Sequence, residues 1–382
     1  MRQRLGWGLI GGGEGSQIGG AHRIAARLDD LFELRAGALD IDAGKARAFG
    51  AQVGLSDDRA YGSWQDMLAG EAARDDRIDL VTIATPNATH FEISKAFLEA
   101  GFHVLCEKPM TMTVEEALAL QQIARDCDRL LAVNFGYCGY PMVRQARAMV
   151  ENGDLGHIRL VMAEFAHGFH ADAADADNPR LRWRYDPDQA GVSSVLADAG
   201  IHALHMIGFV AGQTIDRLSA EFHSHVSGRE LEDDALVSLA YSGGTRARLW
   251  TSAIAVGQMH GLNIRVFGEK GGLAWRQEQP NQLAWTPLGG RTEVLERGGE
   301  GLYPSAAGGS RIAVGHPEGL LVAFANLYRG IHSAISGGAT SIGALEAALV
   351  PSADDGVEMV RAVHAAARSA AGDGEWITIR SR

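Results

Sequence analysis

The first third of the chain alternates apolar runs of strand length with segments of helical period. The strand-like runs are 5–11, 32–39, 78–84, 102–106 and 129–133, and the helical segments are 19–29, 43–50, 63–72, 87–100 and 113–126. This alternation is typical of βαβ units around a parallel sheet. Thr113 followed by Glu116 is a capping box, which starts the last of these helices. Residues 1–133 are therefore predicted to form a doubly wound α/β domain with a parallel sheet.

The pattern changes after residue 134, and a chain of 382 residues exceeds the usual size of one hydrophobic core. Strand-like runs follow at 158–167, 217–226, 235–241, 245–256 and 262–268, with helical segments at 139–152, 198–211, 317–337 and 343–371. Long β-type runs joined by turns predict a large, mostly antiparallel open sheet with one covered face. Residues 134–382 are thus predicted to form a second α/β domain, and the glycine-rich segment 286–312 a long excursion from it.

Charge and cysteine content limit the partners and the compartment. The formal net charge of −12, without a basic run, argues against nucleic acid as a partner. No apolar segment approaches the ~20 residues that a membrane span needs. Cys106, Cys127 and Cys138 form an odd set without metal-ligand spacing, which is typical of reduced thiols. These features predict a cytoplasmic protein.

Glycines follow the first strand in the stretch GGGEGSQIGGAHR. Glycines there let the backbone turn tightly and approach a pyrophosphate at the start of the next helix. The best match to the dinucleotide spacing is Gly11, Gly13 and Gly19, because Ser16 occupies the usual third position. Asp40 ends the second strand, where a carboxylate binds an adenosine ribose and repels a 2′-phosphate. This favours NAD over NADP, with Arg47 as a residue that could still accommodate the phosphate; the alternative for Asp40 is a solvated turn acid.

Two further strands end in polar residues at the same edge of the predicted sheet. Thr85, Pro86 and Asn87 follow the third strand and suit contact with a ribose or nicotinamide, although Asn87 or Thr89 could instead cap the next helix. Lys108 follows the fourth strand, and Pro109 restricts its backbone. Because ligands bind beyond the carboxyl ends of such strands, Lys108 is predicted to point at a ligand; the alternative is a solvated lysine.

With the glycine turn, ATPNATH and CEKP in order, nearly the whole chain resembles the Gfo/Idh/MocA family of oxidoreductases. The resemblance implies an N-terminal Rossmann domain, a C-terminal domain that often mediates oligomerisation, and a catalytic or substrate-orienting role for Lys108. It also implies a second motif, D-x-G-x-H, which is present as Asp198 and His202 in ADAGIHALH. The expected cofactor-binding residues are Gly11, Gly13, Gly15, Ser16, Gln17, Ile18, Asp40, Thr85, Pro86, Asn87, His90, Glu107, Lys108 and Asn134.

The spacing of Asp198 and His202 agrees with catalysis of alcohol oxidation. Residues four apart on a helix share one face, so both side chains can reach one hydroxyl-bearing carbon. A histidine is suited to accept the hydroxyl proton, while the carboxylate orients it or binds a neighbouring hydroxyl. A nearby Lys108 cation would favour the developing alkoxide. Lys108, Asp198 and His202 are therefore the predicted catalytic residues.

Other residues are candidates for the pocket, each with a structural alternative. His205 stands where many relatives carry an acid; Asp198, His202 and His205 could be read as metal ligands, but a hydrogen-bonded His205 at the pocket wall is expected and no metal is predicted. Tyr137, in NFGYCGYPM, contacts substrate or packs between domains. Arg184, in LRWRYDP, binds a polyhydroxylated ring or lies on a surface loop. His316, in GHPEG, precedes an expected helix start at Pro317 and points into a pocket or into solvent.

These stretches, with EKGGLAWRQ at 269–277, resemble the family branch of scyllo-inositol and levoglucosan dehydrogenases. The predicted function is NAD-dependent oxidation of a secondary hydroxyl of a cyclic polyol or sugar. Predicted substrate contacts are Lys108, Tyr137, Arg184, Asp198, His202 and His316. The alternatives are an NAD-retaining glycosidase of the same fold and a non-enzymatic NAD sensor. A homodimer or homotetramer is expected, since an exposed sheet face needs cover.

Overall fold

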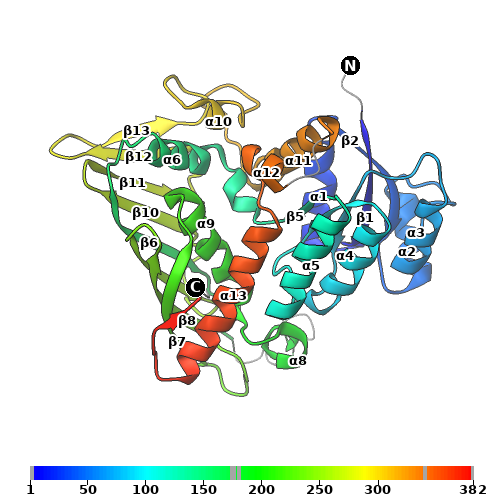
Figure 1. Ribbon diagram of the computed structural model, residues 1–382, viewed down its shortest axis with the longest axis horizontal. Coiled ribbons are helices and arrows are strands. Elements are labelled where there is room, and N and C mark those ends of the chain that lie inside the picture. The colour runs from blue at the N-terminus through cyan, green and yellow to red at the C-terminus, as the bar shows by residue number, and fades with distance from the viewer. Residues whose placement is uncertain (1–3, 173–177, 179–181, 339–341, 380–382) are drawn as a thin grey trace. The chain divides into compact units, whose positions relative to one another are not determined.

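The structure, a computed structural model, describes residues 4–172, 178, 182–338 and 342–379. The chain divides into two compact units, Met1–Gly139 with Leu320–Val357, and Tyr140–Gly319 with Glu358–Arg382 (Figure 1). This division differs from the predicted boundary at 133 and 134, because a C-terminal segment returns to the first unit. Each unit has its own sheet.

The first unit contains a parallel five-stranded sheet in the order β2-β1-β3-β4-β5. Its strands are β1 (Leu5–Gly11), β2 (Phe32–Ala38), β3 (Leu80–Ala84), β4 (His103–Cys106) and β5 (Leu131–Val133). Its connecting helices are α1 (Gln17–Arg27), α2 (Ala43–Gln52), α3 (Trp64–Ala72), η1 (Asn87–Thr89), α4 (His90–Glu99) and α5 (Val114–Asp126). The predicted doubly wound domain is confirmed, and so is the Thr113–Glu116 capping box at the start of α5. All five strands end at one edge, where polar loop residues gather.

The C-terminal segment completes the core of this unit. Its helices are α11 (Leu320–Ser336), α12 (Ile342–Ala347) and the first residues of α13 (Ala353–Ala371). Helix α11 packs along α1, and the buried ring of Tyr328 meets Trp7 and Phe32 edge-on at centroid distances of 5.8 and 5.5 Å. This burial is what returns the segment to the first unit.

Two predicted helix boundaries in this segment are wrong. The helix expected from Pro317 begins instead at Leu320, because Glu318 is buried beside Arg297 and accepts hydrogen bonds from the backbone of Arg311 and Ile312. The single helix expected over 343–371 is two helices. Pro351 lies between them, and a proline interrupts the helical hydrogen-bond ladder.

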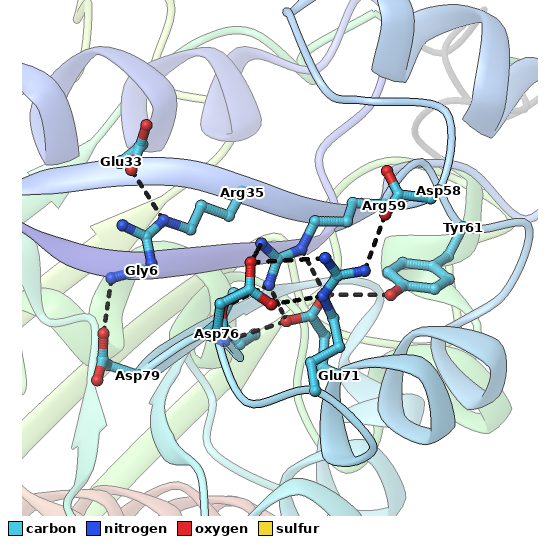
Figure 2. Close-up of polar contacts among 11 residues, drawn as sticks. Gly6, Glu33, Arg35, Asp58, Arg59, Tyr61, Glu71, Asp76 and Asp79 are labelled. Carbon is cyan, nitrogen blue, oxygen red and sulfur yellow. Dashed lines mark hydrogen bonds and ion pairs between the residues drawn. The ribbon is translucent and has the colours of Figure 1, made fainter.

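A buried ion pair between Arg59 and Glu71 links α3 to the neighbouring loops of the first unit (Figure 2). The carboxylate of Glu71, on α3, has no exposed side-chain surface and receives Arg59 at 2.7 and 3.0 Å. It also accepts the Tyr61 hydroxyl at 3.1 Å and the Ile78 backbone N–H at 3.0 Å. Four hydrogen bonds compensate the desolvation of this carboxylate, so the pair holds α3 and the loops around it in place.

The second unit is built on a nine-stranded sheet in the order β13-β12-β11-β10-β6-β9-β8-β7-β14. Its strands are β6 (Ile158–Ala166), β7 (Ile215–His223), β8 (Asp234–Tyr241), β9 (Arg246–Ser252), β10 (Asn263–Gly268), β11 (Gly271–Arg276), β12 (Gln282–Pro287), β13 (Glu293–Glu296) and β14 (Ile377–Thr378). Only the β6–β9 pair is parallel among these strand pairs, which confirms the mostly antiparallel sheet. Strands β11, β12, β13 and β14 were not predicted; β12 and β13 reach into the segment expected to be an excursion.

Two helices cover one face of this sheet. Helix α6 (Pro141–Glu151) packs on β11 and β12, and α9 (Ile201–Ala211) packs on β6, β9 and β10 (Figure 1). Among the described residues, the other short helices are η2 (Gly136–Gly139) in the first unit, and η4 (Trp183–Tyr185), α8 (Pro187–Ala190), the π-helical turn η5 (Leu196–Gly200) and α10 (Pro304–Ala307) in the second. Within the described ranges, no helix has both the length and the apolar character to cross a membrane.

Candidate active site

The glycine-rich turn after β1 passes between the ends of the neighbouring strands. Gly11 has a φ of +75°, and a Cβ atom there would lie 2.5 Å from the carbonyl oxygen of Ala84. A Cβ on Gly13 would lie 2.3 Å from the carbonyl oxygen of Leu39. Neither position has space for a side chain. The turn therefore presents bare backbone at the sheet edge, which is the geometry that lets a pyrophosphate approach.

Helix α1 begins directly after this turn. Ser16, the residue in place of the usual third glycine, caps the helix by accepting the Gly19 N–H at 3.1 Å. Gly19 packs against Gly12, and a Cβ atom added to Gly19 would lie 2.1 Å from the carbonyl oxygen of Gly12. Gly15, Gln17 and Ile18 lie in the same turn and first helical residues. The first N–H groups of a helix lack partners within it, so this end suits an anion.

Asp40 lies beside the turn, directly after β2. Its Oδ1 accepts the backbone N–H of Asp42 at 2.9 Å, and its Oδ2 is 3.7 Å from the position of a Cβ on Gly13. The carboxylate thus caps a local turn, as in the alternative considered from the sequence, and it also lies beside the glycine loop; its contact with a ribose stays a prediction. The guanidinium of Arg47 lies beside Gly62, 3.2 Å from the position of a Cβ there.

The loop after β3 carries Thr85, Pro86 and Asn87. Pro86 is exposed, while Thr85 and Asn87 are half-buried. The Thr89 hydroxyl donates to the carbonyl oxygen of Pro86 at 2.8 Å, and α4 gains no side-chain cap among the described residues. Capping by Thr89 was therefore the wrong alternative. His90 is fully buried beneath this loop, where it supports the backbone.

Glu107, Lys108 and Asn134 lie together after β4 and β5. Glu107 is buried, accepts the backbone N–H of Lys108 at 3.1 Å and receives the Asn134 side-chain amide. Lys108 is half-buried, and its peptide bond to Pro109 is cis. Tyr137, in η2, is also half-buried. All of the predicted cofactor residues therefore lie at or beneath one edge of the Rossmann sheet, and their backbone and side-chain chemistry fits a dinucleotide.

The second unit carries Asp198 and His202. Asp198 lies in the π-helical turn η5, and His202 follows in the first turn of α9. Arg184, from η4, donates Nε to Asp198 Oδ2 at 3.0 Å and stacks on Trp183 at 4.5 Å. Isolated π-helical turns in α-helices are frequent at functional sites. The structure thus brings Arg184 to Asp198, a contact that the sequence did not predict.

A group of aromatic and histidine side chains that the sequence did not predict lies around His202 on α9. The ring of His202 lies 6.1 Å from Phe165, which is itself 6.1 Å from His260. His167 lies 5.3 Å from His170, whose Nδ1 is 2.8 Å from the Tyr185 hydroxyl. The only local signal was the pair of histidines in AHGFH, at the end of β6.

Burial and neighbouring charges lower the pKa values of the two histidines at the end of β6. Burial lowers the pKa of His167 to about 4, assisted by His170, His260 and Arg184 and opposed by Asp198. Burial also lowers the pKa of His170 to about 4, assisted by Arg184. Both rings are neutral at neutral pH, so each offers one N–H donor and one acceptor nitrogen.

Two other predicted residues have different surroundings. His205 is buried and stacks on Phe209 at 5.9 Å. His316 is exposed and, with Asn281 and Arg297, lines a cavity of about 490 Å³ in the second unit. In the part of the chain that the structure describes, no group of three histidine, cysteine or acidic side chains is placed to hold a metal ion.

Comparisons with known proteins agree with both units. Residues 5–135 match the oxidoreductase family with an NAD-binding Rossmann fold, and residues 143–274 match the GFO/IDH/MocA C-terminal domain. An uncharacterized oxidoreductase of Bacillus subtilis, YfiI, is 38% identical over 98% of this chain and 97% of its own length. The levoglucosan dehydrogenase of Pseudarthrobacter phenanthrenivorans is 26% identical over 99% of this chain and 98% of its own.

Solved structures are similar over nearly the whole chain. An inositol dehydrogenase homolog from Azotobacter vinelandii, complexed with NAD+, has a TM-score of 0.93 and 44% identity, covering 98% of this chain and 97% of that one. The same homolog complexed with NADH and myo-inositol has a TM-score of 0.91 and 42% identity, covering 98% of each chain. The predicted family, fold class, enzyme class and cofactor are confirmed. This protein is an NAD-binding oxidoreductase and belongs to the Gfo/Idh/MocA family.

Proposed function

We propose that this protein oxidises a secondary hydroxyl of a cyclic polyol or sugar. The observation that carries the proposal is the similarity, over 98% of both chains, to an inositol dehydrogenase homolog complexed with NADH and myo-inositol. The 26% identical levoglucosan dehydrogenase supports an anhydrosugar as a second member of the same substrate class. The cofactor supplies the hydride acceptor when it is bound.

Three side chains supply the proton transfer, charge stabilisation and orientation that alcohol oxidation also needs. His202 accepts the hydroxyl proton, which leaves from oxygen as the hydride leaves from carbon. Lys108 supplies a positive charge that favours the developing alkoxide. Asp198, held by Arg184 at 3.0 Å, orients His202 or binds a neighbouring hydroxyl. These are the catalytic roles that we assign.

The polar residues around α9 suit a polyol. The neutral rings of His167 and His170 can exchange hydrogen bonds with hydroxyl groups, which both donate and accept. The guanidinium of Arg184 adds N–H donors beside the carboxylate of Asp198. Tyr137 and His316 remain proposed substrate contacts. A substrate with many hydroxyls on a ring matches this concentration of paired donors and acceptors.

A substrate screen tests this function. The purified protein is incubated with NAD and a panel of inositols, levoglucosan and aldoses, and NADH is followed by absorbance. NADH that accumulates in proportion to one cyclic substrate supports the proposal. Release of a free sugar from a glycoside without net NADH would indicate the glycosidase, and NAD binding without turnover of any panel member would indicate a sensor.

The cofactor preference is expected to depend on Asp40. Asp40→Ala should weaken NAD use and reduce discrimination against NADP, because the carboxylate binds the ribose and repels a 2′-phosphate. Steady-state kinetics with both cofactors check this, and Asp42→Ala, which removes the cap of α2 but not the ribose carboxylate, is the matched control. A wild-type protein that prefers NADP would contradict the role given to Asp40.

We also expect the protein to form a homodimer or homotetramer. Strand register places Leu236, Phe267 and Val294 on the face of the large sheet opposite α6 and α9, and each is at least 41% exposed. Exposed apolar side chains on one face indicate an interface. Light scattering of the wild type should give two or four times the 40.7 kDa mass of one chain. Phe267→Glu, which places a charge on this face, should lower the measured mass. A monomeric wild type at micromolar concentration would overturn this expectation.

A further inference from the structure

A chain of hydrogen bonds runs through the first unit to the residue before Lys108. His22, on α1, is fully buried; its Nδ1 lies 2.8 Å from the Tyr328 hydroxyl and its Nε2 3.0 Å from Glu107 Oε1. The Tyr328 hydroxyl lies 2.9 Å from the Thr82 hydroxyl, which accepts the indole N–H of Trp7 at 2.9 Å. The chain connects α11, β3 and α1 to the end of β4.

The two ends of this chain constrain where its protons lie. The indole of Trp7 can only donate, and an ionised Glu107 can only accept. Every hydroxyl proton in between is used when Thr82 donates to Tyr328 and Tyr328 donates to His22 Nδ1. His22 then keeps its proton on Nε2 and donates it to Glu107. Whichever way the two hydroxyl protons point, His22 Nε2 carries a proton and donates it to Glu107.

Glu107 links this chain of hydrogen bonds to the backbone of Lys108. Its Oε1 accepts His22 and Asn134, and its Oε2 accepts the backbone N–H of Lys108 at 3.1 Å. Burial would raise the pKa of Glu107, but the hydrogen bond and charge of His22, the charge of Lys108 and the hydrogen bond from Asn134 outweigh it and lower the pKa to about 2. The carboxylate is thus ionised and held by three donors.

His90 holds the other side of Lys108. Its ring is fully buried, with Nδ1 2.8 Å from the carbonyl oxygen of Pro109 and Nε2 2.9 Å from that of Thr85. Carbonyl oxygens accept and cannot donate, so both contacts are hydrogen bonds only when both ring nitrogens carry protons. A neutral ring would set a nitrogen lone pair against a carbonyl lone pair. This geometry requires an imidazolium.

The surroundings of His90 support that charge. Burial lowers its pKa, but the neighbouring Cys106 and the two carbonyl oxygens outweigh burial and raise the pKa to about 9. Cys106, on β4, is the titratable group that acts on this ring, and its thiol faces the carbonyl oxygen of Met110 at 3.8 Å. The two carbonyl dipoles offset part of the cost of burying the cation.

We propose that His22 and His90 are positioning residues that clamp the backbone on both sides of Lys108, His22 as a hydrogen-bond donor to Glu107 and His90 as an imidazolium joining Pro109 to Thr85. The clamp ties Lys108 to the helix of the glycine turn and to the loop after β3, both of which belong to the predicted cofactor site. Its effect on turnover rests on the proposed role of Lys108, whereas the proton on His22 Nε2 and the two protons on the His90 ring do not.

Nuclear magnetic resonance of ¹⁵N-histidine protein tests the protonation states directly. The His90 signals, assigned by their loss in His90→Gln, should show protons on both ring nitrogens at pH 7 and lose one as the pH rises through about 9. The His22 signals, assigned with His22→Gln, should show a proton on Nε2, the nitrogen that faces Glu107. A single-proton pattern for His90 at pH 7, or a His22 without a proton on Nε2, would overturn the clamp whether or not any polyol is oxidised.

Kinetics test the positioning. His22→Leu should lower kcat about tenfold or more, because small displacements of a reacting group are costly, while the NAD dissociation constant from calorimetry stays within about threefold. His22→Gln, which retains an N–H donor for Glu107, should recover most of this loss. Tyr328→Phe should lower kcat less than His22→Leu, and Tyr241→Phe, which removes a buried hydroxyl without a hydrogen-bond partner among the described residues, should leave kcat unchanged. Wild-type kcat in His22→Leu would contradict the proposal.

Discussion

His202→Ala is expected to lower kcat for polyol oxidation by about 10²- to 10⁴-fold, the usual range for loss of a general base. The hydroxyl proton would then pass to water, without a positioned acceptor. NAD binding should remain nearly intact, because His202 lies on α9 of the second unit and the glycine turn belongs to the first. The measurement is steady-state turnover on the best substrate of the screen, with calorimetry of NAD binding in parallel.

The pH profile separates a lost base from a damaged fold. Wild-type turnover should fall on the acid side, where a histidine base becomes protonated, and this limb should move or vanish in His202→Ala. His157→Ala removes an exposed histidine next to β6 and should leave the profile unchanged. Near wild-type turnover of His202→Ala from pH 6 to 9 would show that another residue is the base, with Lys108 the next candidate.

Lys108→Met is expected to lower kcat by about 10²- to 10³-fold, since the alkoxide loses a positive charge placed to stabilise it. Methionine keeps much of the apolar stem of lysine, so the half-buried packing at the end of β4 should persist. The folded state is checked by thermal denaturation, and turnover is measured with the same substrate as for His202→Ala.

Two further variants make the Lys108 result interpretable. Lys108→Arg keeps the charge and should retain more activity than Lys108→Met, although its planar fork differs in geometry. Lys95→Met removes an exposed lysine that pairs with Glu99 on α4, and its kcat should match the wild type. Equal activity of Lys108→Met and Lys95→Met would refute a role for the Lys108 charge.

Local pattern was sufficient for the N-terminal part of the first unit, up to β5 (Leu131–Val133). The alternation of apolar runs and helical segments predicted its strands and helices because period reports which side of an element is buried. The glycine turn and Asp40 could be predicted for a related reason. A tight turn needs residues without a Cβ, and a strand end needs a polar group where the sheet stops. The structure places these residues together at one edge.

The second unit shows where local pattern fails. Strands β11, β12 and β13 were missed because they are short and contain glycine and polar residues, so their stability comes from pairing along the sheet. The π-helical turn at Asp198 has no sequence period of its own. Its contact with Arg184 joins residues 14 positions apart, on separate short helices.

The sequence by itself determined the element types of the first unit, the cofactor turn and the candidate catalytic residues, because each depends on a few adjacent side chains. Only the tertiary structure decided the partners of those residues. Tyr328 lies 306 positions from His22, and Tyr185 lies 15 from His170, yet each pair is hydrogen-bonded at 2.8 Å. Such pairs form when distant segments bury their apolar faces together, and that packing brings polar groups into contact that no local spacing records.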